Sequence, residues 1–382
     1  MIIDDLTIII SVVVLLIAIV TPMINKFFRK PNFDENNCTE QNQENLPKMS
    51  IIIIAHGNAK ELDDHLSLFL TQDYSPGYEV IVVTSKSDSD AEDVLKQYSN
   101  NPHLYTTFTP DSSRYMSRRK LAITLGVKAA KNEWVILTDA YCCPASDEWL
   151  TTMAAKCTES TNLVLGYTRF TEETSPFSRF ERLGNAYYLL REAQQGIAYC
   201  SLGKNIAFRK SEFMAQNGYQ GNLKYIYGEY DFLVNKYAKD GCTNTVTNPK
   251  GWIIEDNPSV KRRRNSHIYY QETRKHLLRS FSHRLAFNVD QLALHLCWLV
   301  IIAAFIWGSL AQRWIIDITA GVALILTILL RTWIAKNAFV QFDENIPLWK
   351  VIFYETGLLW HNIVYKLWYA KTDKYDFICH KI

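Results

Sequence analysis

The sequence predicts an α/β domain with a mostly parallel sheet and helices on both faces, joined to one N-terminal and two C-terminal transmembrane helices. Between residues 51 and 138, short apolar runs alternate with helical segments, which is typical of a parallel sheet covered on both sides. Three apolar stretches near the two ends of the chain are long enough to cross a hydrocarbon core. A 48% hydrophobic content over 382 residues is enough to fill the core of one large domain or two ordinary ones.

The first apolar stretch, "IIISVVVLLIAIVTPMI", covers residues 8 to 24. Two acids precede it and three basic residues follow it: Asp4, Asp5, Lys26, Arg29 and Lys30. A secretory signal would have basic residues before the apolar run and a small-residue cleavage site after it. We therefore expect a retained membrane anchor within residues 1–30, followed by a polar linker at 31–47.

The other two stretches, 292–310 and 314–334, are separated by a short polar turn and predict a transmembrane hairpin within residues 286–336. Basic residues flank it on both sides: Arg262, Arg263, Arg264, Arg274, Lys275, Arg279, Arg284, Arg331 and Lys336. The positive-inside rule then places the N-terminus outside and residues 31–285 in the cytosol. We expect the three helices to lie in a plasma or inner membrane. The alternative is that the hairpin is a buried helical pair of a soluble protein.

The final segment, 337–382, contains Trp, Tyr and charged residues at helical spacing between 346 and 370. This pattern indicates a helix lying in the membrane interface. A third cytoplasmic helix that packs on the domain is the alternative.

Several classes of protein are disfavoured by composition. A net charge of +2 gives no broad basic surface, so we expect no nucleic-acid partner. The eight cysteines lack paired spacing, so neither a zinc site nor a disulfide framework is indicated. A transporter or channel would need more spans and more acids within them than Asp317 alone.

The expected elements of the middle segment follow one another closely. They are strand 51–55, helix 61–70, strand 79–84, helix 90–98, strand 105–108, helix 118–130, strand 134–138, strand 163–167, helix 177–195 and strand 252–255. A further helix is expected to start near Ser146, with Ser146 as its N-cap.

The strand ending in "TDAY" places Asp139 at its carboxyl tip, with Tyr141 two residues later. Acids at such tips contact phosphates, metals or sugars, because ligands bind at the carboxyl ends of strands in open α/β sheets. A metal between phosphates is normally held by two carboxylates. Here one carboxylate and one phenol are present. The alternative role for Asp139 is an N-cap of the following helix.

Six segments, taken in order, resemble a membrane-anchored family 2 glycosyltransferase with a GT-A fold, over nearly the whole chain. They are "IIIIAHGNA", "TQDYSPGYEVIVVTSKSDSD", "RRKLAITLGVKAAKNEWVILTDAYCCPASDEWL", "SLGKNIAFRKSEF", "GEYDFLVNKYA" and "QETRKH". The resemblance implies a cytosolic GT-A domain at residues 48–285. The chain departs from the family where Ala59, Ser85 and Tyr141 replace acids.

The resemblance also implies roles for individual residues. Those expected at the nucleotide-sugar donor are Asn58, Ser85, Lys120, Asp139, Tyr141, Gln271 and Arg274. Asp139 would hold a divalent metal, Mg²⁺ or Mn²⁺, that stabilises the departing diphosphate. Glu229 would be the general base, with Asp231 two residues on as the other candidate. Either carboxylate could instead stabilise the dipole of the helix that follows.

Tyr141 cannot serve as an anionic ligand near neutral pH, because an ordinary Tyr has a pKa of about 10. We expect its hydroxyl to donate a hydrogen bond to a phosphate, or its ring to stack on the sugar or base, while Lys120 and Arg274 offset diphosphate charge. The cations at the start of the helix, Arg118, Arg119 and Lys120, oppose the helix dipole and therefore need some other reason to be there.

These features predict an inverting glycosyltransferase that uses a nucleotide sugar and a membrane-associated acceptor, either lipid-linked or an envelope glycan. Inversion is implied by the resemblance alone. The alternative is a catalytically impaired GT-A membrane protein that acts as a binding or assembly partner, which the three lost acids favour and the retained site residues oppose.

Overall fold

The computed structural model describes residues 4–33, 45–110, 116–196, 198–279 and 281–378. Most of the expected linker, residues 34–44, lies outside this set. The chain divides into two compact units. The helical unit comprises Met1–Lys30, Ser175–Tyr188 and Arg279–Val364, and the sheet unit comprises Pro31–Thr174, Leu189–Leu278 and Tyr365–Ile382.

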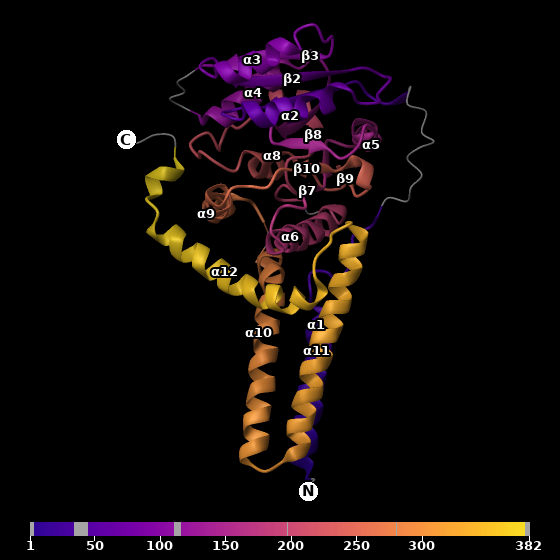
Figure 1. The fold of residues 1–382 in the computed structure, drawn as a ribbon, viewed down its shortest axis with the longest axis vertical. Helices are drawn as coiled ribbons and strands as arrows, with labels where there is room; N and C mark the ends of the chain where they lie inside the picture. Colours follow the sequence, from indigo (N-terminus) through magenta and orange to yellow (C-terminus); the bar gives the residue numbers. More distant parts are fainter. Residues whose placement is uncertain (1–3, 34–44, 111–115, 197, 280, 379–382) are drawn as a thin grey trace. The chain divides into compact units, whose positions relative to one another are not determined.

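The sheet unit is built on a seven-stranded sheet in the order β3-β2-β1-β4-β8-β6-β9 (Figure 1). Its strands are β1 (Met49–Ile54), β2 (Tyr78–Ser85), β3 (Leu104–Thr109), β4 (Trp134–Asp139), β6 (Leu163–Gly166), β8 (Ile206–Arg209) and β9 (Thr243–Val246). The pairs among β3, β2, β1 and β4 are parallel, whereas β8 runs antiparallel to both of its neighbours. The predicted mostly parallel sheet is therefore confirmed.

A second sheet of three strands, β5-β10-β7, was not predicted. It consists of β5 (Cys142–Pro144), β7 (Thr168–Phe170) and β10 (Ile253–Glu255). Strand β5 pairs antiparallel with β10, with Cys142 opposite Glu255. The chain thus passes from the end of β4 into a new sheet within three residues, which fixes the backbone around Tyr141.

Helices cover both faces of the larger sheet. The helices of the sheet unit are α2 (Ala59–Leu70), α3 (Ser89–Gln97), α4 (Arg118–Ala129), α5 (Trp149–Ala154), α7 (Lys210–Ala215), α8 (Glu229–Tyr237), α9 (Val260–His276), and the short η3 (Pro249–Gly251) and η5 (Lys374–Phe377). Ile51 and Ile53 share a buried core with Leu62 and Leu66 of α2. On the opposite face α4 approaches so closely that a Cβ on Gly126 would lie 2.7 Å from Cγ2 of Ile52.

The helix expected to start near Ser146 begins at Trp149 instead. Its N-cap is Glu148, whose side chain makes no capping hydrogen bond. The hydroxyl of Ser146 donates to the carbonyl of Lys250 (2.8 Å). The prediction of Ser146 as the cap is wrong because the preceding strand β5 pairs with β10 and draws Ser146 into the turn beside η3.

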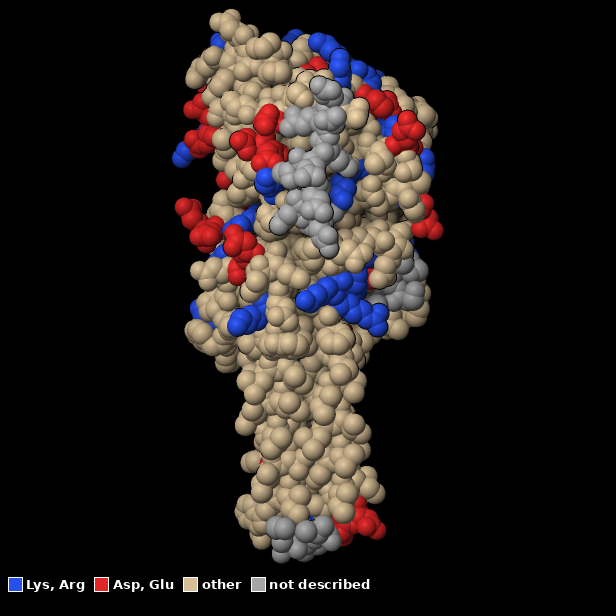
Figure 2. Space-filling model, turned by 90° about the vertical axis from the view of Figure 1, so that its right-hand side faces the viewer, with Lys and Arg blue, Asp and Glu red and all other residues tan. Residues whose placement is uncertain are grey.

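Among its described residues, the helical unit contains three helices long and apolar enough to cross a membrane. They lie within α1 (Asp5–Met23), α10 (Phe281–Leu310) and α11 (Trp314–Gln341). Two further helices, α6 (Pro176–Gln194) and α12 (Val351–Lys371), contribute residues to both units, and η4 (Leu348–Lys350) precedes α12. On the face shown in Figure 2, the bundle is free of charged side chains over most of its length.

Small residues let the three helices approach one another. The buried core of the bundle includes Ala18 of α1, Ala304 of α10, and Ala320 and Ala323 of α11. Close packing of this kind replaces the hydrophobic driving force that is absent between helices in lipid. The hairpin is therefore packed against the N-terminal helix.

Charged residues lie at both ends of this bundle. At one end Arg313, in the α10–α11 turn, pairs with Asp4 at the start of α1 (2.5 Å). Further along, Arg331 of α11 is fully buried and contacts two acids, Asp290 of α10 (2.6 Å) and Glu355 of α12. The start of α1 and the hairpin turn thus lie at the same end of the bundle, as the predicted topology requires.

We expect the α10–α11 turn to face outward and the sheet unit to face the cytosol, because basic residues follow α1 and precede α10. A membrane-impermeant maleimide applied to intact cells should label Ala311→Cys, placed in the turn, above the wild-type background. Cys157 and Cys242 should react only after the membrane is permeabilised and the protein is mildly denatured. Strong labelling of either cysteine from outside would reverse the topology.

Candidate active site

The carboxyl ends of the central parallel strands lie at one edge of the larger sheet. The β1–β4 register places Ile54 opposite Asp139, and the β1–β2 register places it opposite Val83. The loops that follow β1 and β2 are tied together, since the N–H of Gly57 donates to Asp88 (3.0 Å). This edge is where an open α/β sheet binds its ligand.

Asp139 is fully buried at the tip of β4. Its Oδ1 pairs with the guanidinium of Arg119, and its Oδ2 accepts a hydrogen bond from the Tyr141 hydroxyl (2.5 Å). Burial raises the pKa of Asp139, but Arg119 and Lys204, together with the two hydrogen bonds, lower it below its ordinary value. Asp139 is therefore held as a carboxylate and does not cap the following helix.

Arg119 joins this carboxylate to a second one. Its Nε lies 2.5 Å from Oε1 of Glu229, while its Nη2 contacts Asp139. Burial lowers the pKa of Arg119, but the charges of Asp139 and Glu229 raise it well above its ordinary value. Arg119 occupies the first turn of α4, so these two ion pairs supply the reason for a cation that opposes the helix dipole.

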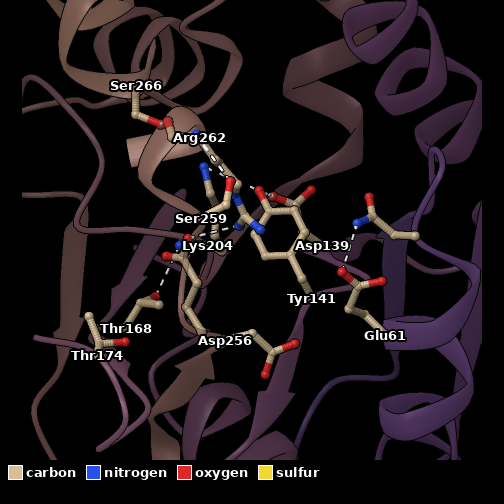
Figure 3. Close-up of polar contacts among 12 residues, drawn as sticks. Glu61, Asp139, Tyr141, Thr168, Thr174, Lys204, Asp256, Ser259, Arg262 and Ser266 are labelled. Atoms are coloured by element: carbon tan, nitrogen blue, oxygen red, sulfur yellow. Dashed lines mark hydrogen bonds and ion pairs between the residues drawn. The ribbon is translucent and has the colours of Figure 1, made fainter. Parts of the chain in front are cut away.

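Tyr141 is enclosed by Asp139 on one side and by α9 on the other (Figure 3). The Cζ atom of Arg262 lies 3.4 Å from the centre of the Tyr141 ring, and Arg262 also pairs with Glu255 (3.1 Å). Burial, followed by the charge of Asp139, raises the pKa of Tyr141 well above its ordinary value. The phenol therefore stays protonated, and its hydroxyl donates to Asp139 where we expected a phosphate contact.

Lys204 approaches the same carboxylate from the loop before β8. Its Nζ lies 3.9 Å from Oδ2 of Asp139 and 4.3 Å from the centre of the Tyr230 ring. The backbone N–H of Lys204 donates to Thr168 Oγ1 (3.0 Å; Figure 3). The buried Tyr230 ring thus lies against this cation.

Gly228 controls the position of Glu229. It caps α8 in the left-handed region (φ 83°), and Glu229, the first residue of the helix, is buried. A Cβ on Gly228 would lie 2.6 Å from Oγ1 of Thr273 on α9. Only glycine meets both requirements without strain, so α8 can begin close to α9 and aim Glu229 at Arg119.

Asp231 has a different environment from Glu229. Its Oδ1 accepts hydrogen bonds from the N–H (3.0 Å) and the hydroxyl (2.8 Å) of Ser201. Burial raises the pKa of Asp231, although the Ser201 hydrogen bonds act in the opposite direction. Asp231 thereby holds the loop that leads from Ser201 to Lys204.

Lys120 points into the interior. It is fully buried, and its Nζ donates to the carbonyls of Asn222 (2.7 Å) and Tyr225. The ammonium also lies 4.8 Å from the centre of the Phe232 ring. The structure thus brings Arg119 to Asp139, whereas the adjacent Lys120 fastens the segment that precedes α8.

The other expected donor residues lie around the same edge or along α9. Asn58 is the N-cap of α2, and its side chain donates to Glu61 (3.3 Å). Ser85 is buried at the end of β2, 3.0 Å from the Ser87 hydroxyl. Gln271 is buried on α9 and Arg274 is partly exposed there. At 1.5 Å per residue their backbones lie about 14 and 18 Å beyond that of Arg262.

The residues present do not fit the expected divalent metal at Asp139. Both of its oxygens are engaged by Arg119 and Tyr141, and the guanidinium of Arg119 also contacts Glu229. Over the described ranges, no group of three His, Cys, Asp or Glu side chains could hold a metal ion. Metal binding at Asp139 stays a prediction, and the geometry of Arg119, which places a positive charge against this carboxylate, does not favour it.

Three of the cations at this site were not among the expected site residues: Arg119, Lys204 and Arg262. The unfavourable charge at the start of α4 was a signal for Arg119, although it pointed equally to Lys120. Lys204 and Arg262 lie in segments quoted for other reasons. Their convergence depends on the second sheet, which the sequence pattern did not reveal.

The fold, with an acid at the tip of β4, is the one that the sequence resemblance led us to expect for a glycosyltransferase. The chain belongs to glycosyl transferase family 21, whose model matches residues 7–360. The motif resemblance pointed to family 2, so the class is confirmed and the family shown is 21. No curated protein matches the sequence.

One solved structure supports the fold, and a second one matches only a part of the chain. A mannosyltransferase from Pyrobaculum calidifontis, PcManGT, in complex with GDP-Man and Mn²⁺, is 16% identical, with a TM-score of 0.50, and the match covers 87% of this chain and 96% of that chain. S. aureus TarS is 14% identical, with a TM-score of 0.40, over 58% of this chain and 38% of that chain.

Proposed function

We propose that this protein is an inverting glycosyltransferase that moves a sugar from a nucleotide-sugar donor to a membrane-associated acceptor. One observation carries the proposal. Asp139 at the tip of β4 and Glu229 at the start of α8 come from distant parts of the chain, yet both contact Arg119. Two carboxylates around one cation, at the ligand-binding edge of a GT-A sheet, suit a reaction that moves a proton and builds negative charge.

The reaction is a single displacement. An acceptor hydroxyl forms a bond to the anomeric carbon as the bond from that carbon to the diphosphate oxygen breaks, and its electron pair stays on the diphosphate. Glu229 receives the hydroxyl proton as general base. Attack from the side opposite the leaving group inverts the anomeric configuration. The mannosyltransferase structure in complex with GDP-Man is consistent with a nucleotide-sugar donor for this fold.

The acceptor is inferred from the helical unit. Three helices long and apolar enough to cross a membrane hold the chain at a lipid surface. An acceptor fixed to the same surface, such as a lipid-linked or envelope glycan, would be concentrated there. An enzyme that acts on a soluble acceptor would not need a membrane anchor to reach it.

A second candidate function is a binding or assembly partner with little turnover. It is favoured by Ala59, Ser85 and Tyr141 at positions where the family has acids, and by the internal pairing of Asp139. The two candidates agree that a nucleotide sugar can bind. They differ on whether a sugar is transferred.

We expect a nucleotide sugar to raise the melting temperature of the full-length protein in detergent. A ligand that binds only the native state stabilises it by about 2.7 kcal/mol at a hundredfold excess over Kd. The screen would compare UDP-, GDP-, CDP- and dTDP-linked sugars with the corresponding free sugars as controls. If no nucleotide sugar shifts the transition, with or without Mn²⁺, the proposed function fails.

A further inference from the structure

Four side chains form a neutral cluster at the tip of β4. Asp139 and Glu229 are the acids, and Arg119 and Lys204 are the cations. Arg119 contacts both acids directly, with Oδ1 as its partner on Asp139. Lys204 lies nearer the other oxygen of Asp139, Oδ2. Arg262 is counted separately because it pairs with Glu255.

The charges in this cluster match those of a metal-loaded site. Two carboxylates carry −2, and one guanidinium and one ammonium carry +2, which is the charge of one divalent cation. Adding Mn²⁺ would place its charge a few ångströms from a guanidinium, and such like charges repel strongly in a partly buried site. The metal would also have to displace hydrogen bonds that Asp139 already makes.

Exposure decides what an incoming ligand meets. The side chains of Asp139 and Glu229 are 0% and 8% exposed, whereas those of Arg119 and Lys204 are 27% and 24% exposed. The acids are therefore covered, whereas both cations are partly exposed. A metal ion arriving from solvent would meet positive charge, and an anion would meet hydrogen-bond donors.

We propose that Arg119 and Lys204 take the place of the divalent metal and bind the diphosphate of the donor directly. This inference rests on the proposed function. A guanidinium presents several N–H groups in a fixed plane that suits phosphate oxygens, so Arg119 can keep its acids and still donate to a ligand. As the bond to the sugar breaks, the charge that grows on the diphosphate lies beside two cations that are already in place.

The structure also assigns Asp139 and Tyr141 to positioning. Tyr141 donates to Asp139, and Asp139 orients Arg119, so neither needs to touch the donor. Asp231 acts similarly on Lys204 through the Ser201 loop. Asp139 and Asp231 thus orient the two cations, whereas Glu229 remains the proposed general base.

Calorimetric titration of UDP, GDP, CDP and dTDP into the full-length protein in detergent tests this. For the nucleotide that binds, the Kd with chelator and the Kd with Mn²⁺ should agree within about threefold, because Arg119 and Lys204 already supply the +2 charge that a divalent metal would bring. Binding that appears only with Mn²⁺ would overturn the inference and leave the proposed function standing. Failure of every nucleotide and every nucleotide sugar in both buffers would overturn the proposed function.

Variants separate the cations from their neighbours. Arg119→Gln should weaken binding in chelator by at least about tenfold, as expected for loss of charged hydrogen bonds, and Mn²⁺ should restore part of it by binding the uncovered acids. Lys204→Gln should weaken binding in both buffers. It provides an independent test of the proposal if Arg119→Gln does not fold. The exposed neighbour Arg118 is the matched control, and Arg118→Gln should bind like wild type. Wild-type affinity in both Arg119→Gln and Lys204→Gln would contradict the assignment.

Discussion

Glu229→Gln is expected to reduce sugar transfer by about 10²–10⁴-fold while nucleotide binding stays intact, because a general base acts mainly on the barrier. Gln keeps the size of the side chain and can still contact Arg119, but it cannot accept the acceptor proton. The change also removes one negative charge beside the diphosphate, so donor affinity should be unchanged or higher. Transfer of label from the nucleotide sugar and calorimetric titration would be measured on the same preparation.

Asp231→Asn is the matched control, two residues along the same helix. An Asn oxygen can still accept hydrogen bonds from Ser201, so most transfer should remain. If Asp231→Asn is inactive and Glu229→Gln retains full turnover, the general base is Asp231. That result would contradict the assignment of Glu229 and leave the fold unaffected.

Arg331→Leu is expected to destabilise the helical unit by about 3–5 kcal/mol, because it leaves buried charges without their partner. Arg331 is fully buried and contacts both Asp290 and Glu355. Asn25 also donates to Glu355 (2.5 Å), so the contacts involve α10, α11, α12 and the segment after α1. Thermal unfolding of the full-length protein in detergent would measure the loss.

Arg313→Leu, on the partly exposed pair with Asp4, is the control and should cost far less. Combining Arg331→Leu with Asp290→Asn and Glu355→Gln should recover much of the stability, since no buried charge then remains unpaired. If the Arg331→Leu protein melts at the wild-type temperature, the ion pairs of Arg331 with Asp290 and Glu355 do not contribute to stability as described.

The parallel half of the sheet could be predicted because its strands are short apolar runs and its helices are amphipathic. Strand β1 (Met49–Ile54) and strand β4 (Trp134–Asp139) are buried on both faces and therefore appear as continuous hydrophobic runs. Strands β5 and β7 have three residues each, too few for a period to be visible. Their pairing with β10 is a long-range contact that local sequence does not encode.

The candidate site was predictable in its acids and not in its cations. Asp139 follows from its place at the end of a buried strand, and Glu229 was implied by the family resemblance. Which of Arg119 and Lys120 faces the site depends on the rotation of α4 about its axis. That rotation is set by packing of residues such as Gly126 against Ile52, which a motif cannot report.

The most direct test of the account is transfer of sugar to a membrane-associated acceptor. Membranes containing the wild-type protein would be incubated with the labelled nucleotide sugar that binds, with chelator present, and label would be followed into the organic-solvent extract and the insoluble envelope glycan. Label should appear in the lipid extract or in the insoluble envelope glycan for wild type and should be lost for Glu229→Gln. Absence of label from both fractions of the wild-type membranes, despite nucleotide-sugar binding by the same protein, would contradict sugar transfer and favour the binding or assembly partner.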